Sequence, residues 1–193
     1  MRRHGSEFRR AGSIAIPLAL VLTGCYHGSA RTASRAELAR EGGWVLVGDL
    51  HLVRQTADRD CGAAALAMML EHWTIHVPPD EILRAAAVAP GHGITAGALR
   101  DFARQKGLQA YLVKGELTDL TNEVGLNRPV LVGLVQRYGD KALSHYEIVG
   151  GINPRTRRVL LFDPAHGLRE DGFEGFSAEW DAAGRPTLVI VPS

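Results

Sequence analysis

The sequence predicts an α+β domain in which an N-terminal helical half packs on a C-terminal antiparallel sheet. Apolar residues between positions 61 and 107 recur at three- and four-residue spacing, which is the period of helices. After position 129 they form short runs rich in β-branched residues, separated by turns, which is the pattern of strands. Helices first and strands second favour two packed halves. We expect a functional cleft at the seam between them.

Composition and charge limit the partners. The 193 residues leave room for one domain of ordinary size. Lysine and arginine together number 22 against 21 aspartate and glutamate residues, so the formal net charge is +1. The charged residues are scattered and form no basic run that would bind a phosphate backbone. We therefore expect no nucleic-acid partner.

The N-terminus has the features of a bacterial export signal. A basic stretch over residues 1–12 precedes an apolar stretch, residues 13–22, that is too short to cross a bilayer as a helix. The following LTGC, which ends at Cys25, resembles a lipobox, in which the cysteine is lipidated and the preceding peptide is removed. We predict a signal peptide over residues 1–24 and a lipid on Cys25. The alternative is an ordinary signal peptide that happens to contain a cysteine.

A lipid on Cys25 predicts where the protein resides. Several acyl chains would hold it on a membrane, because each buried methylene adds about 0.8 kcal/mol of affinity. Tyr26 rather than aspartate follows the cysteine. By analogy with enteric lipoproteins, we expect the outer membrane of a bacterial cell envelope, facing the periplasm. Residues 25–43 are polar, small and arginine-rich, which predicts a flexible tether to a folded domain over residues 44–193.

The helical half begins after a β-like stretch that ends at Gln55. A helix is expected from Cys61, with Asp60 at the N-cap position. A second helix is expected over residues 78–88, and a third runs from the cap Thr95 to the stop at Gly107. A weaker helix follows. The sheet half then has four predicted strands, at residues 129–136, 144–152, 157–164 and 186–193.

The position of Cys61 predicts a reactive thiol. The chain has two cysteines, so a lipid on Cys25 leaves Cys61 without a disulfide partner within the chain. A helix N-terminus favours the thiolate, which is the nucleophilic form, through its unpaired N–H groups and the helix dipole. A histidine from elsewhere in the fold would have to take the proton. The plain alternative is a small buried residue at a helix start.

His145 and Asp163 are the expected partners of Cys61. His145 begins an apolar strand, and Asp163 ends the next one. The turn NPRT between them, residues 153–156, would make the two strands neighbours and bring the carboxylate beside the imidazole. Gln55 could donate its amide to an oxyanion together with the backbone N–H of Cys61. Taken singly, a satisfied core histidine and a turn aspartate remain alternatives.

Three segments resemble a known family. QTADRDCGAAALAMML, SHYEIVGGI and VLLFDPAHG are similar to the bacteriocin-processing, double-glycine leader peptidases, which are papain-like cysteine peptidases. The resemblance implies a papain-like fold with Cys61 as nucleophile, His145 as base, Asp163 as its orienting group and Gln55 as oxyanion-hole donor. Glu147 stands in a strand position that is usually apolar in this family, and the sequence assigns it no role.

These observations predict a lipid-anchored cysteine peptidase that cleaves a peptide or an exported polypeptide. The partner would be that substrate, including one that belongs to an export or secretion system. No metal and no organic cofactor is expected. Two alternatives remain open. One is a non-catalytic module that binds a peptide in the same cleft, and the other is an acyl or peptidyl transferase that uses the same three residues.

Overall fold

The computed structural model describes residues 25–89 and 92–193. The predicted signal peptide, residues 1–24, lies outside these described residues. Within the described part, no helix is both long and apolar enough to span a membrane.

The described residues form six helices and eight strands, which alternate more than the sequence predicts. The helices are α1 (Arg35–Glu41), α2 (Cys61–His72), α3 (Pro79–Ala85), α4 (Ala96–Gln105), α5 (Leu117–Gly125) and α6 (Phe173–Ala182). The strands are β1 (Arg31–Thr32), β2 (Val45–Leu46), β3 (Leu108–Lys114), β4 (Val130–Tyr138), β5 (Lys141–Asn153), β6 (Arg158–Asp163), β7 (Gly167–Gly172) and β8 (Pro186–Pro192). The α+β fold class is confirmed.

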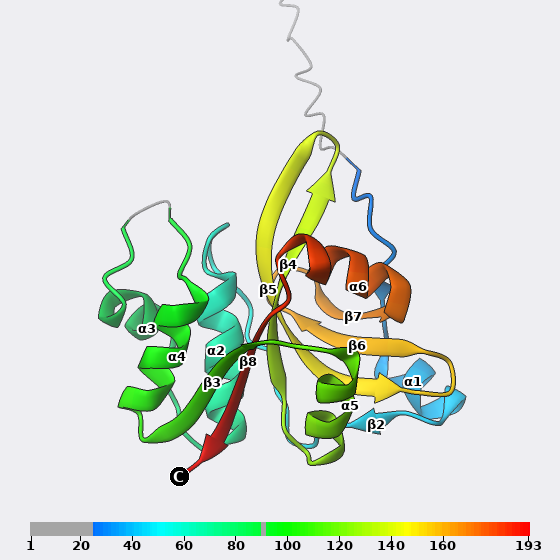
Figure 1. Cartoon of the computed structure of the whole chain (residues 1–193), viewed down its shortest axis with the longest axis horizontal. Helices are drawn as coiled ribbons and strands as arrows, with labels where there is room; N and C mark the ends of the chain where they lie inside the picture. The colour runs from blue at the N-terminus through cyan, green and yellow to red at the C-terminus, as the bar shows by residue number, and fades with distance from the viewer. Residues whose placement is uncertain (1–24, 90–91) are drawn as a thin grey trace, which may run out of the picture.

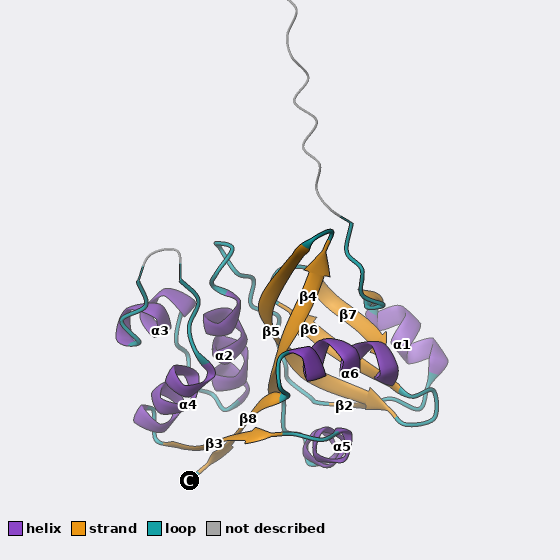
Figure 2. Cartoon of the chain, turned by 45° about the horizontal axis from the view of Figure 1, so that its top comes forward, coloured by secondary structure: helices purple, strands orange, loops and turns teal. Residues whose placement is uncertain are grey.

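The strands form one antiparallel sheet in the order β1-β7-β6-β5-β4-β8-β3, with β2 paired to β5. Figures 1 and 2 both place α2, α3 and α4 side by side on one side of the molecule, whereas α6 lies on the part of the sheet that holds β4, β6 and β7. Helix α2 packs against β5. The seam between the two halves therefore runs along α2 and β5.

Helix α2 is the centre of the core. Its residues 61–70 are all buried, so the helix has no polar face, as expected of a helix surrounded by protein. Small side chains let its neighbours approach closely. A Cβ atom added to Gly62 would lie 2.5 Å from Ile94 Cγ2 and 2.9 Å from Tyr146 Cδ2. The position of Cys61 is thus fixed by close packing on the residue that follows it.

The segment predicted to be a tether is instead part of the fold. Residues 25–43 contain β1, which pairs with β7, and α1, which is capped by Ser34 and buries Leu38. Tyr26 forms a further bridge with Tyr138. Arginines and small polar residues suggest a solvated chain, but here several of them bond to buried acidic groups of β7. Only the sheet, formed much later in the chain, supplies those partners.

Other elements also differ from the prediction. The β-like stretch before Gln55 contains only the two-residue strand β2. Strand β7 was not predicted, because its sequence GLREDG looks like a solvated turn; in the fold, Arg169, Glu170 and Asp171 are all buried. Helix α6 was not predicted either, because only Phe176 and Trp180 mark its buried face. In β7, ion pairs with residues distant in the sequence take the place of the apolar pattern on which strand prediction relies.

Candidate active site

Cys61 opens α2 and is a free, buried cysteine with 7% of its surface exposed. Asp60 precedes it at the N-cap position, as predicted, but its side chain makes no capping hydrogen bond. Its carboxylate accepts a hydrogen bond from the hydroxyl of Thr56 instead, at 3.0 Å. Asp60 is therefore the N-cap residue by position only. The loop Thr56–Asp60 satisfies the carboxylate locally, as short polar side chains often do.

His145 faces the seam from the first half of β5 and is 9% exposed. Its Nε2 donates a hydrogen bond to Asp163 Oδ1 at 2.8 Å. Asp163 ends β6, the strand that follows β5 through the turn predicted at residues 153–156. Because Nε2 is occupied by the carboxylate, the other ring nitrogen, Nδ1, is left for a thiol. The structure thus brings together the histidine and aspartate that the sequence placed on neighbouring strands.

The electrostatics of this pair favour a charged imidazole. Burial lowers the pKa of His145, but the hydrogen bond to Asp163, the neighbouring Cys61 side chain and the charge of Glu147 outweigh it and raise the pKa to about 10. Burial raises the pKa of Asp163, but the bonds from His145 and His166 hold it well below its usual range. The site is therefore built to hold an imidazolium beside a carboxylate.

The carboxylate of Asp163 accepts hydrogen bonds from several other donors. Its Oδ1 also accepts the backbone N–H groups of Ala165 at 2.7 Å and His166 at 3.2 Å. Its Oδ2 accepts from His166 Nδ1 at 2.8 Å and from Arg169 Nη1 at 3.2 Å. A buried carboxylate with this many donors stays ionised and keeps one orientation.

Sequence reasoning missed a buried polar cluster behind the imidazole. Glu147 is fully buried on β5, and its Oε1 lies 3.8 Å from His145 Nε2 and 3.7 Å from Arg169 Nη1. Gln136 donates to the same oxygen at 2.7 Å, whereas Oε2 has no partner among the described residues. Burial, and then the charge of Asp163, raise the pKa of Glu147 to about 8. The available signal was Glu147 itself, a glutamate between Tyr146 and Ile148 in an otherwise apolar predicted strand.

The same cluster resembles a cation site in its geometry. One possible ligand atom from each of His145, Glu147 and Asp163 lies within 4.8 Å of the others. The guanidinium of Arg169 already supplies the positive charge, because it lies 3.2 Å from one carboxylate and 3.7 Å from the other. We therefore assign no metal to this cluster.

Arg169 is itself held by the N-terminal residues 26–33, which we call the docked segment. Its Nη2 donates to the backbone oxygen of Ala30 at 3.1 Å, and its Cζ lies 4.7 Å from the centre of the Tyr26 ring. The hydroxyl of Tyr26 donates to Glu179 of α6. Support for Asp163 thus comes in part from a segment outside the predicted domain.

Gln55 lies in the loop that leads to Cys61. Its backbone N–H donates to Pro164 O at 3.1 Å, and the neighbouring Arg54 donates to Ala165 O at 2.7 Å. These bonds tie the loop before the thiol to the turn after Asp163. The side-chain amide of Gln55 donates to Ala57 O at 3.1 Å, and its Oε1 is buried without a partner among the described residues. The loop is therefore in place, while the amide bonds within it.

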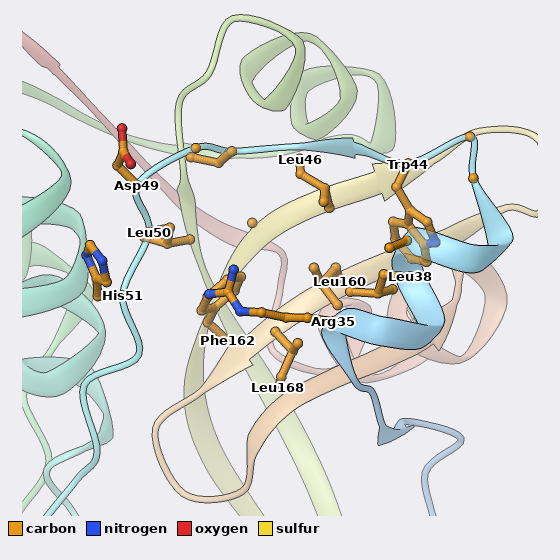
Figure 3. Close-up of a pocket in the computed structure, with 16 residues that line it drawn as sticks. Arg35, Leu38, Trp44, Leu46, Asp49, Leu50, His51, Leu160, Phe162 and Leu168 are labelled. Carbon is orange, nitrogen blue, oxygen red and sulfur yellow. The ribbon is translucent and has the colours of Figure 1, made fainter.

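Of two cavities in the structure, one lies beside the start of α2 and the other is not lined by the candidate catalytic residues. A hollow of about 550 Å³ lies beside the start of α2 and is lined by Asp60 and His92, among others. A second cavity, of about 630 Å³, lies between α1, the stretch around β2 and the sheet. Figure 3 shows Leu160, Phe162 and Leu168 on its sheet side and Leu38 and Trp44 opposite. None of the residues that line the second cavity is Cys61, His145 or Asp163.

Comparison with known proteins finds similarity over most of the chain. The Peptidase C39 family matches residues 49–185. An uncharacterized protein of Methanothermobacter marburgensis is 35% identical over 130 residues, which cover 66% of this chain and 82% of that protein. The matched family region includes Cys61, His145 and Asp163 and excludes the docked segment.

Solved structures share the fold. The peptidase domain of Streptococcus ComA, a bi-functional ABC transporter involved in a quorum sensing pathway, has a TM-score of 0.62 at 23% identity and covers 75% of this chain and 99% of that domain. A double glycine motif protease from an AMS/PCAT transporter, solved in complex with the leader peptide, has a TM-score of 0.58 at 20% identity, with 74% and 91% of the two chains covered.

Proposed function

The chain belongs to the Peptidase C39 family, and on that premise we propose that it is a cysteine peptidase in which Cys61, His145 and Asp163 perform the reaction. The observation that carries the proposal is the 2.8 Å bond between His145 and Asp163, at the seam where α2 presents the thiol. It orients the imidazole, stabilises its charged form and leaves Nδ1 free for Cys61.

The proposed reaction has two steps. The proton of the thiol passes to His145, and the sulfur of Cys61 attacks the peptide carbonyl carbon. The resulting oxyanion is held by the backbone N–H of Cys61 and by the amide of Gln55, which would first have to leave Ala57 O. His145 then gives its proton to the departing amine, which leaves a thioester. Water, activated by His145, hydrolyses the thioester and restores the thiol.

We propose a peptide or an exported polypeptide as the substrate. The similar protease from an AMS/PCAT transporter was solved with a leader peptide bound, which supports a peptide partner. The hollow beside Asp60 offers space next to the start of α2. We also propose that Cys25 carries a lipid, and that the protein resides on the outer membrane of a cell envelope. The support is the order of basic stretch, apolar stretch and LTGC in the sequence.

The reactivity of Cys61 tests the proposed catalytic pair. The rate of iodoacetamide alkylation is measured against pH in the full chain with Cys25→Ser, so that Cys61 is the remaining thiol. We expect rapid alkylation near pH 6 that slows strongly in His145→Ala, because the imidazolium stabilises the thiolate. The matched control is His166→Ala, which removes a histidine from the same carboxylate and should alter the rate much less.

A different result would favour one of the alternatives. Little reaction below pH 8, with no dependence on His145, would indicate a structural cysteine and a non-catalytic peptide-binding module. A reactive thiol whose acyl product passes to an added amine faster than to water would indicate a transferase.

A further inference from the structure

The chain leaves Cys25 fixed against the tip of the β4–β5 hairpin. The carbonyl oxygen of Cys25 accepts the backbone N–H of Gly139 at 3.1 Å, and the N–H of His27 donates to the backbone oxygen of Arg137 at 2.9 Å. Between these two bonds, Tyr26 pairs with Tyr138, and their ring centres lie 5.4 Å apart. Cys25 therefore continues the hairpin edge, and the tip of the β4–β5 hairpin is the upper end of the ribbon in Figure 1.

The residues that follow Cys25 are bonded directly to the sheet and to α6. The Tyr26 ring is held against Arg169, and its hydroxyl bonds to Glu179. Further along, Ser29 donates to Asp171 at 2.6 Å, and Arg31 bonds to Glu170 at 2.7 Å. The docked segment is thus attached at several points, so Cys25 and the hairpin tip form one rigid end.

The surface of this end combines cationic groups with an apolar side chain. Arg137 and Lys141 are exposed on the two strands beside the turn, with one acidic residue, Asp140, between them. Leu143 is 46% exposed two residues beyond Lys141. Basic groups are attracted to anionic headgroups, and an apolar side chain gains free energy on entering the lipid boundary. This combination is complementary to a phospholipid surface.

We propose that this hairpin end contacts the membrane, so that Arg137, Lys141 and Leu143 bind the same lipid surface as the acyl chains on Cys25. The inference rests on the proposed lipidation of Cys25. It deepens the proposed function, because His145 lies on β5 only five residues after Asp140. At about 3.4 Å per residue, the imidazole is at most ~17 Å along the strand from the tip.

This distance restricts the substrate. A flexible tether of residues 26–43 would let the site range over tens of ångströms, since its ends would be separated by roughly 24 Å on average and by much more when extended. A pinned Cys25 instead keeps the Cys61–His145 pair close to the headgroups. The substrate class is therefore a polypeptide segment that lies on the membrane or emerges directly from it.

Tryptophan quenching by brominated lipid tests the contact. The full chain, purified from membranes with Cys25 shown by intact mass to be lipidated, is placed in vesicles of phosphatidylethanolamine and phosphatidylglycerol with brominated acyl chains. Leu143→Trp is compared with Leu126→Trp, which replaces a 59% exposed leucine at the end of α5. Figures 1 and 2 place α5 far from the hairpin tip. Both are read against the parent chain, which contains Trp44, Trp73 and Trp180.

We expect several-fold stronger quenching and a blue-shifted emission for Leu143→Trp, and neither for Leu126→Trp. Arg137→Glu combined with Lys141→Glu should reduce the quenching of Leu143→Trp. Equal quenching at the two positions in a lipidated chain would overturn this inference and leave the proposed peptidase intact. An intact mass without lipid on Cys25 would overturn both this inference and the proposed anchoring, whereas the alkylation of Cys61 tests the catalytic proposal separately.

Discussion

The two sides of the candidate site are held by different forces. Cys61 stands on a helix whose buried face is made of alanine, glycine, leucine and methionine, so dispersion and close packing fix the thiol. His145 stands in a part of the sheet that buries Gln136, Glu147, Asp163 and Arg169, so hydrogen bonds and charge fix the imidazole. We therefore expect substitutions that change side-chain volume to lower stability on the helix side, and substitutions that change charge to lower it on the sheet side.

The largest expected effect is on the sheet side. Asp163→Asn removes the charge that faces His145, His166 and Arg169 while it keeps the shape of the side chain. Breaking a buried charge cluster in this way costs about 3–5 kcal/mol. We expect a lower free energy of unfolding in urea and slower alkylation of Cys61 at pH 6. Asp181→Asn, which removes an exposed partner of Arg185, is the control and should leave both nearly unchanged. An equally stable Asp163→Asn chain would show that charge does not hold this side.

The second effect is a loss of stability as the pH rises above about 5. His145 has a raised pKa, so the stability that it contributes is complete below about pH 6.5 and is lost as the pH rises through about 10. Glu147 also has a raised pKa, of about 8. The unfolded chain therefore ionises Glu147 first, and stability falls between about pH 5 and 8.

The variant Glu147→Gln separates the loss of stability caused by ionisation of Glu147 from the loss caused by His145. Glutamine can still accept the hydrogen bond from Gln136 but cannot ionise. We expect the fall in unfolding free energy between pH 5 and 8 to shrink by roughly 3 kcal/mol, while the fall towards pH 10 remains. Urea titrations at a series of pH values measure both. Glu174→Gln, at an exposed position on α6, is the control. An unchanged slope in Glu147→Gln would mean that this carboxyl is not held protonated.

The smallest expected effect tests packing on the helix side. Gly62→Ala places a methyl group 2.5 Å from Ile94 Cγ2 and 2.9 Å from Tyr146 Cδ2. Overpacking of this kind costs about 1–3 kcal/mol, in part offset by the better helix propensity of alanine. Thermal unfolding should show a lower midpoint. Gly97→Ala in α4 meets no atom closer than 4.0 Å and should be neutral or stabilising. Similar midpoints for the two variants would contradict tight packing beside Cys61.

The same contrast explains what the sequence could predict. Helices α2 to α5 and strands β4, β5, β6 and β8 were expected, because each has a local apolar period, a cap or a turn that marks it. The neighbouring positions of His145 and Asp163 followed from one short turn between adjacent strands. The catalytic roles of Cys61, His145 and Asp163 stay predictions that the alkylation of Cys61 in the variants tests, and the role of Gln55 stays a prediction.

Strand β3 was missed although its sequence LQAYLVK alternates locally, whereas strand β7, helix α6 and the docked segment could not be predicted, because they depend on contacts between distant parts of the chain. Arg169 contacts Tyr26, Ala30 and Asp163 at once, and no local pattern marks an arginine for burial. Strand β7 becomes recognisable only when β1 and β6 pair with its two edges. The prediction of a tether failed for the same reason, since the acidic partners of the docked segment lie on β7 and α6.

The docked segment also fixes the order in which the site can form. Its side chains find partners 139 to 153 positions later in the sequence, so it is made first but can pair only after β7 and α6 exist. Closing so long a loop is slow, and it gains free energy only when the distant strand is already in place. A nascent or truncated chain that ends before Asp163 would hold both Cys61 and His145, yet it would lack the carboxylate that orients the imidazole and the arginine behind it. The site is therefore completed when residues 163–182, near the end of the chain, fold back on the first residues of the fold.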